Sequence, residues 1–338
     1  MEITFDKIGK KGFECNFEKI KAKKIKGNFK CFISQDEKEI VTASRNTVYI
    51  HNLENKECIF QAKSLSNIYM AVISPDKQII AVKNTLGEIE LLDAKTGTSL
   101  YKNKMCKKQG ENLCFTDDSQ YIVDIDWNGN VMRLDCKTGE FTILDNHIEL
   151  CRCYYIHYDV HTDQIYRFIA AGYGNAPGFI ECSTIESKEI AKGIISFKKV
   201  QTFKDKLPMV HMGISFCKNH NYYYELTQKK LIQTDKNFKI LNSFDLPNTK
   251  AIKSLDHFWI SPEEKYLFLD FGIQCSEEIP KQSDYETCPW YSVLIDLQTM
   301  QIIHEYNLPY VSDFTMYEND TKYVISTWNA INLYSFDA

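Results

Sequence analysis

The chain has 338 residues, of which 44% are hydrophobic and 25% are charged, so it can bury a sizeable core and is not intrinsically disordered. Its net charge of -5 disfavours nucleic acid as a partner, because a phosphate-binding surface needs an excess of basic residues. No apolar run approaches the roughly 18 residues of a membrane helix, and Met1–Lys10 has no apolar signal segment, so we expect a soluble, cytoplasmic protein.

The cysteines favour free thiols over a disulfide framework. There are twelve, at irregular spacings and without a secretory signal, which is typical of a reducing compartment. Several are flanked by apolar residues, and we expect these to be buried: Cys31, Cys58, Cys114 and Cys217.

Residues 1–28 form a lysine-rich lead-in with two strand-like pieces, Ile3–Ile8 and Phe13–Ile20. The last repeat of the chain has only three strands, which would leave an exposed sheet edge. We therefore expect one N-terminal strand to pair at this edge and to close the last sheet.

From residue 29 onward one pattern recurs: an apolar strand, a Ser or its substitute, an acidic turn, and two further strands separated by turn residues. The clearest copies are Phe29–Phe60, Met70–Tyr101, Asn112–Leu144 and His257–Tyr306. Weaker copies near Tyr158 and Phe216 and a truncated copy at the end bring the number to seven.

The residue after the first strand of each copy sets the period: Ser34, Ser74, Thr116, Asp159, Cys217, Ser261 and Tyr317. Most intervals lie near 40 to 45 residues, the period of a four-stranded β-propeller blade. The strands are rich in β-branched and aromatic residues, and no long window has helical periodicity. The sequence thus predicts an all-β chain, residues 1–338 forming one seven-bladed propeller with four antiparallel strands per blade.

Four short segments resemble a known family. They are SPDKQIIAV and SPEEKYLFL at two repeat openings, and LLDAKTG and RLDCKTG before two final strands. These segments resemble WD40-like and YVTN-type β-propellers, although Asn52, Asp93, Asp135 and Asp296 follow His, Leu, Leu and Ile where the family has Trp-Asp. The resemblance implies a protein-interaction scaffold.

Two repeats are longer than the others, and insertions in repeat proteins often carry binding sites. The extra length falls at Ala170–Gly178 and Gly272–Pro289, which we place between second and third strands. A further excess, Lys192–Pro208, is expected between a fourth strand and the next repeat. The family resemblance implies that all three emerge on one face.

We therefore predict a non-catalytic, monomeric module without a cofactor or metal, which binds a protein or peptide on the long-loop face. Aromatic anchors and acidic side chains there would suit a basic partner. The candidate contacts are Tyr173, Asn175, Phe179, Glu277, Glu278, Tyr285 and Trp290. A solvated acidic loop is an equally plain interpretation of the acidic residues.

The alternative is a propeller enzyme or small-ligand receptor of the lactonase or hydrolase type. Alternate residues of each first strand, Val72 and Trp259 among them, are expected to face a central channel. That expectation would bring together His157, His211, His257 and Asp313, whose side chains could hold a metal or a polar ligand. Polar channel residues in contact with water need no ligand, however, and His147, Cys151, Cys153 and His157 lack the usual spacing of a zinc site. Motifs of nucleotide-binding loops and of common hydrolases are absent from the sequence.

Overall fold

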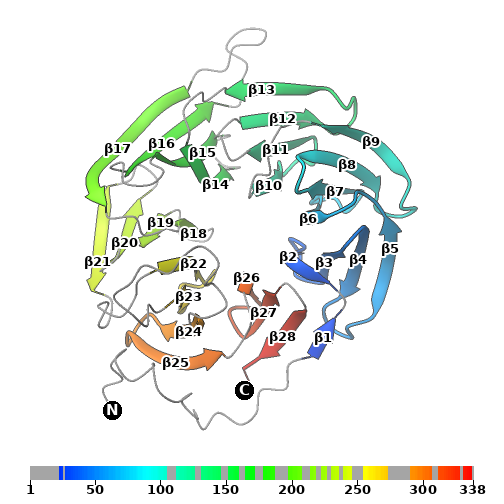
Figure 1. Ribbon diagram of the computed structural model, residues 1–338. Helices are drawn as coiled ribbons and strands as arrows, with labels where there is room; N and C mark the ends of the chain where they lie inside the picture. The colour runs from blue at the N-terminus through cyan, green and yellow to red at the C-terminus, as the bar shows by residue number, and fades with distance from the viewer. Residues whose placement is uncertain are drawn as a thin grey trace, which may run out of the picture. The chain divides into compact units, whose positions relative to one another are not determined.

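The computed structural model describes residues 23–25, 27–104, 112–125, 131–145, 151–159, 164–171, 178–186, 197–207, 214–217, 222–226, 230–235, 239–245, 254–272, 290–306, 311–327 and 330–336. Every regular element among them is a β-strand, which confirms the all-β prediction (Figure 1). None of these residues belongs to a helix long and apolar enough to cross a membrane.

The chain divides into two compact units, which we describe separately. The first unit is Lys24–Lys206 with Asn329–Ile331, and the second contains Leu207–Trp328 and Asn332–Ala338. Their strands form four-stranded sheets, and neighbouring strands are antiparallel wherever their register is described, as predicted.

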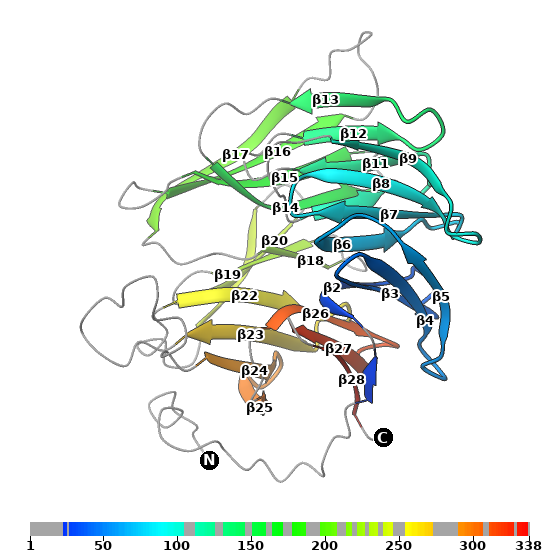
Figure 2. The same ribbon diagram turned by 45° about the vertical axis from the view of Figure 1, so that its right-hand side comes forward.

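The first unit holds four sheets in chain order, and strands of each are labelled in Figure 2. Their strands are β2 (Asn28–Ile33), β3 (Glu39–Ser44), β4 (Thr47–Asn52), β5 (Cys58–Lys63); β6 (Ile68–Ile73), β7 (Ile79–Asn84), β8 (Glu88–Asp93), β9 (Ser99–Lys104); β10 (Asn112–Phe115), β11 (Tyr121–Ile125), β12 (Val131–Asp135), β13 (Phe141–Asp145); β14 (Cys151–Asp159), β15 (Gln164–Ala171), β16 (Gly178–Glu186) and β17 (Phe197–Leu207).

The second unit holds two complete sheets and the three strands that end the chain. The strands are β18 (Ile214–Cys217), β19 (Tyr222–Leu226), β20 (Lys230–Asp235), β21 (Ile240–Asp245); β22 (Ser254–Ile260), β23 (Tyr266–Gly272), β24 (Trp290–Asp296), β25 (Gln301–Tyr306); β26 (Val311–Tyr317), β27 (Lys322–Thr327) and β28 (Ile331–Ser335). A short N-terminal strand, β1 (Lys23–Ile25), adds to the last of these sheets in the order β1-β28-β27-β26. The two strand-like pieces expected within residues 1–20 lie outside the described residues.

The turn between the first two strands uses the same side-chain hydrogen bonds in several sheets. The Ser34 hydroxyl donates to Asp36 Oδ1 (2.7 Å) and accepts the N–H of Glu39 (3.0 Å). Ser74 and Thr116 bond in the same way to the residues two and five positions later. A hydroxyl followed by Asp therefore satisfies the main chain of a tight turn, which explains why these residue types recur after the first strand.

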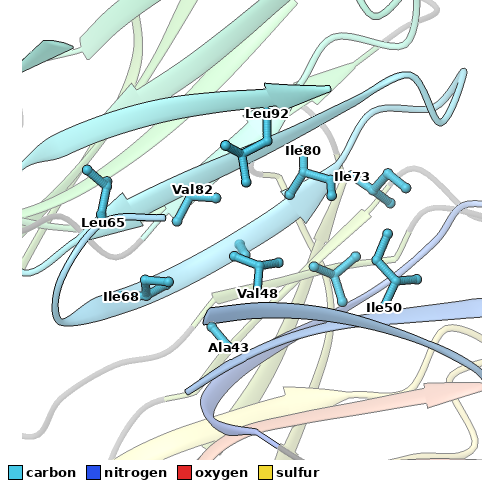
Figure 3. Close-up of a cluster of buried hydrophobic side chains, with 11 residues drawn as sticks. Ala43, Val48, Ile50, Leu65, Ile68, Ile73, Ile80, Val82 and Leu92 are labelled. Atoms are coloured by element: carbon cyan, nitrogen blue, oxygen red, sulfur yellow. The ribbon is translucent and has the colours of Figure 1, made fainter. Parts of the chain in front are cut away.

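The core lies between consecutive sheets. Ala71 and Ile73 of β6 belong to a buried cluster shared with β3 and β4, part of which Figure 3 shows. Val72, between them in the sequence, belongs to another cluster with Leu113 of β10. Since successive strand side chains point to opposite faces, the β6–β9 sheet is packed on both faces. The expectation that Val72 faces a channel is therefore wrong, because alternate residues of the strand face neighbouring sheets and Val72 is fully buried.

The outer strands also contact the turns of the following sheet. Gly139, with φ of 72°, lies so close to the Tyr101 ring of β9 that an added Cβ would collide with it. Gly97, with φ of 73°, lies over Phe60 and Ala62 of β5 in the same manner. Glycine is required at both turns for its positive φ and for this close approach.

Two sequence expectations about particular segments are wrong. Lys192–Pro208 is not a connection, because most of it forms β17, the last strand in the order β14-β15-β16-β17. Cys58 is exposed rather than buried; it begins β5, the last strand in the order β2-β3-β4-β5. Cys31 is buried as expected, on the first strand of that order, β2, and Cys114 is partly buried.

Candidate functional site

The two long connections lie between the second and third strands of their sheets, as predicted. Residues 172–177 connect β15 to β16, and residues 273–289 connect β23 to β24. The equivalent connections are residues 45–46 between β3 and β4, 85–87 between β7 and β8, and 126–130 between β11 and β12, so residues 273–289 are much longer and residues 172–177 only slightly longer. In the β14–β17 sheet much of the extra length falls instead in residues 187–196, which connect β16 to β17, and in longer strands.

Two of the seven predicted contact residues lie in strands that flank these connections. Phe179 is near the start of β16 with its Cα opposite Ala171, and Trp290 begins β24 opposite Gly272. The other five lie outside the described residues: Tyr173, Asn175, Glu277, Glu278 and Tyr285.

Three of the four residues of the alternative, channel-mouth site lie on first strands. His157 is opposite Tyr166 in the β14–β15 pair, His257 is opposite Asp270 in the β22–β23 pair, and Asp313 is opposite Ser326 in the β26–β27 pair. His211 and His147 lie outside the described residues, while Cys151 and Cys153 lie along β14. Within the described ranges, no three His, Cys, Asp or Glu side chains are grouped as metal ligands.

A buried ion pair that sequence reasoning missed lies in the first unit. Lys83 of β7 donates through Nζ to Asp124 Oδ1 of β11, and neither side chain is exposed to solvent. The two residues come from the second strands of consecutive sheets. The signal in the sequence was a charged residue that follows an apolar run in each of two strands, Lys83 in IIAVKN and Asp124 in YIVDI. Burial with a charged partner makes this pair a structural feature of the interior, since no reactive group meets solvent there.

The acidic residues at the positions where the WD40 family has Trp-Asp act locally. Asp93 Oδ1 accepts the N–H groups of Lys95 (3.0 Å) and Thr96 (2.7 Å), and the Thr96 hydroxyl (2.8 Å). These bonds, led by that of the Thr96 hydroxyl, lower the pKa of Asp93. Asp135 binds its own turn through the N–H groups of Lys137 and Thr138, both at 2.8 Å, and its pKa is also lowered. These carboxylates hold turns together and are not poised as general acids, because their charged form is favoured.

Apolar side chains on the outer strands are exposed. Ile59 of β5, Leu100 of β9 and Leu241 of β21 are each the unpaired residue of a β-bulge. Their exposed fractions are 54%, 53% and 47%. Bulges of this kind hinder edge-to-edge pairing of sheets, so the exposed outer strands are protected from it. Further exposed apolar residues are Leu86, Phe141, Ile143 and Ile240.

No protein-family model matches the chain, and the search of curated proteins finds no match.

Proposed function

We propose that the chain is a non-catalytic, monomeric protein-interaction module that folds as a WD40-like, seven-bladed β-propeller in the cytoplasm. The proposed partner is a protein or peptide, and the proposed face is the one that carries the two long second-to-third-strand connections. One observation supports it most: among sheets with the same strand order, the second-to-third-strand connection of the β22–β25 sheet, residues 273–289, is by far the longest of its type. Binding residues are concentrated on loops that a rigid scaffold positions.

The internal chemistry of the described residues is consistent with a scaffold. Asp36, Asp93 and Asp135 use their carboxylates to close turns, and Asp124 pairs with Lys83 in the interior. Propeller closure is part of the proposal: the addition of β1 beside β28 supports joining the chain ends in the last blade.

The test is affinity capture by the full chain and by a Tyr173→Ala/Trp290→Ala double variant, with captured proteins measured by mass spectrometry. A matched control is Leu100→Ala, which also removes an exposed apolar side chain but from an outer strand. The proposal expects one or more partners to bind the full chain and the control and to be lost from the double variant, whose melting temperature stays unchanged. Equal capture by all three proteins contradicts the proposed face.

The alternative function, that of a propeller enzyme of the hydrolase type, is tested by measuring bound metal. Purified full chain is analysed for bound metal beside a His211→Ala/His257→Ala variant. A stoichiometric ion that is lost in the variant favours a site at these histidines, and its absence from both proteins removes a metal-dependent form of the alternative.

A further inference from the structure

The fourth residue of the turn between the first and second strands has an unusual backbone conformation. Counting the anchor residue of the turn as the first, this position has positive φ in five sheets. The residues and angles are Glu37 (56°), Lys77 (59°), Ser119 (62°), Glu264 (55°) and Asp320 (64°). Left-handed backbone is unfavourable for residues with a Cβ and glycine adopts it readily, yet none of the five is glycine. A side chain at this position must therefore contribute something that glycine cannot.

In three of the five turns this side chain contacts the preceding turn of the same unit. Lys77 Nζ lies 2.8 Å from Asp36 Oδ2 and 3.2 Å from Glu39 Oε1. Ser119 Oγ accepts the N–H of Asp76 at 3.1 Å.

The third contact is in the second unit, where Asp320 Oδ2 accepts the N–H of Glu263 at 3.1 Å. The turn before Glu264, residues 218–221, lies outside the described residues.

The target of the contact is the same in each case. Asp36, Asp76 and Glu263 are all the third residue of the preceding turn. The same position of the turn is thus contacted by an ammonium group, a hydroxyl group and a carboxylate group. The hydroxyl and the carboxylate each accept a main-chain N–H. Because three different chemistries converge on one target, the contact follows from the geometry of adjoining sheets and not from one side chain's preference.

We propose that Lys77, Ser119 and Asp320, each the fourth residue of its first turn, are latches that fix one sheet to the sheet before it at the turn end. The latch side chain replaces water at a main-chain N–H or a carboxylate of the preceding turn, and this gain offsets the cost of its left-handed backbone. Together with the apolar cluster between the sheets, the latch couples local unfolding of one sheet to that of the next. The amides of the preceding turn are therefore protected from hydrogen exchange only while the following turn is folded.

Asp320 indicates that the contact offsets the free-energy cost of removing a carboxylate from water. Its side chain is buried, and its second oxygen, Oδ1, has no hydrogen-bond partner. Burial raises the pKa of Asp320, against the lowering effect of hydrogen bonds from Ser261, Glu263 and Lys265. A carboxylate held in this way is costly without a role, since a buried acceptor that lacks a partner is destabilising.

The first test follows the exchange of the Asp76 amide hydrogen with deuterium, resolved by NMR, in the full chain. Ser119→Ala removes the accepting hydroxyl and keeps the Cβ, whereas Ser119→Gly removes the hydroxyl and relieves the left-handed backbone. The latch requires faster exchange of Asp76 in both variants, by roughly two- to tenfold. The control Gln120→Ala alters the next, exposed side chain and leaves this exchange unchanged. Unchanged exchange in Ser119→Ala, or faster exchange in the control as well, overturns the proposal.

The second test uses Asp320 and the amide of Glu263. Asp320→Asn keeps a side-chain oxygen in place, so protection of the Glu263 amide is expected to persist, while Asp320→Ala is expected to lose it by a similar factor. Loss in both variants would mean that the charge and not the accepting oxygen matters, and protection in both would mean that no latch exists; either result contradicts the proposal. Far-ultraviolet circular dichroism verifies that each variant is folded before exchange is measured.

Discussion

Lys83 and Asp124 meet inside the first unit as an ion pair between the second strands of consecutive sheets, and neither side chain reaches solvent. Such a pair ties two sheets together through charges that water does not screen. Comparing a single substitution with the double substitution distinguishes two free energies: the cost of a buried charge without its partner, and the net contribution of the ion pair to stability.

Lys83→Met is expected to destabilise the protein by about 3–5 kcal/mol, because it leaves the Asp124 carboxylate buried without its cation. The double variant Lys83→Met/Asp124→Leu is expected to recover most of this loss, since matched apolar residues can replace a buried ion pair. Urea unfolding followed by fluorescence measures both. The exposed Lys102→Met serves as the control, and a double variant no more stable than the single one would contradict the interpretation.

Val72 provides a test of packing on both faces of the β6–β9 sheet. Val72→Ala removes two methyl groups from a fully buried position between sheets and is expected to cost about 1–3 kcal/mol. Ile59→Ala removes a larger apolar side chain from a residue that is 54% exposed, and is expected to change stability by less than about 0.5 kcal/mol. Denaturant unfolding of the two variants compares them directly. If Val72 instead faced an open channel, its substitution would cost no more than that of Ile59.

His51 makes stability sensitive to mild acid. Its side chain is buried on β4 with Nδ1 lacking a partner, and burial lowers the pKa of His51 below its usual 6.5. Below pH 6.5 the unfolded chain therefore binds a proton at His51 more readily than the folded protein does. The free energy of unfolding is unaffected by His51 above pH 6.5 and decreases as the pH falls below it. Burial lowers the pKa of His304 as well, which adds to the same trend.

The measurement is the free energy of unfolding of the parent and of His51→Gln between pH 7.5 and 5.5. The variant is expected to show a shallower decline over this range, because it no longer carries the titrating ring. Parallel curves for the two proteins would show that His51 has no part in the pH dependence.

The closing strand gives a test of the propeller proposal. A chain that begins at residue 26 lacks β1 and leaves β28 with an unpaired edge, whereas a chain that begins at residue 23 keeps β1. We expect the shorter chain to melt a few °C below the longer one, since each kcal/mol of lost strand pairing moves Tm by roughly 2–4 °C in a protein of this size class. Equal melting temperatures would contradict a closing role for β1.

The sequence by itself determined most of the strands and several of their turns, although it took the strand β17 for a connection. Some side chains form hydrogen bonds with main-chain groups only a few residues away, as Ser34, Ser74 and Asp93 do. Their roles are local and can therefore be predicted from the sequence. The long connection between β23 and β24, residues 273–289, was also predictable from the sequence, whereas in the β14–β17 sheet much of the extra length lies in residues 187–196 and in longer strands.

Only the tertiary structure decided where side chains of each strand point and what they meet. Sequence alternation separates two faces of a strand but does not say what covers them; Val72 packs against a neighbouring sheet and Cys58 lies exposed on an outer strand. The Lys83–Asp124 pair and the contacts of Ser119 and Asp320 join residues about one repeat apart. Such partners are fixed by how sheets stack, and stacking depends on the summed packing of many side chains, which no single spacing in the sequence encodes.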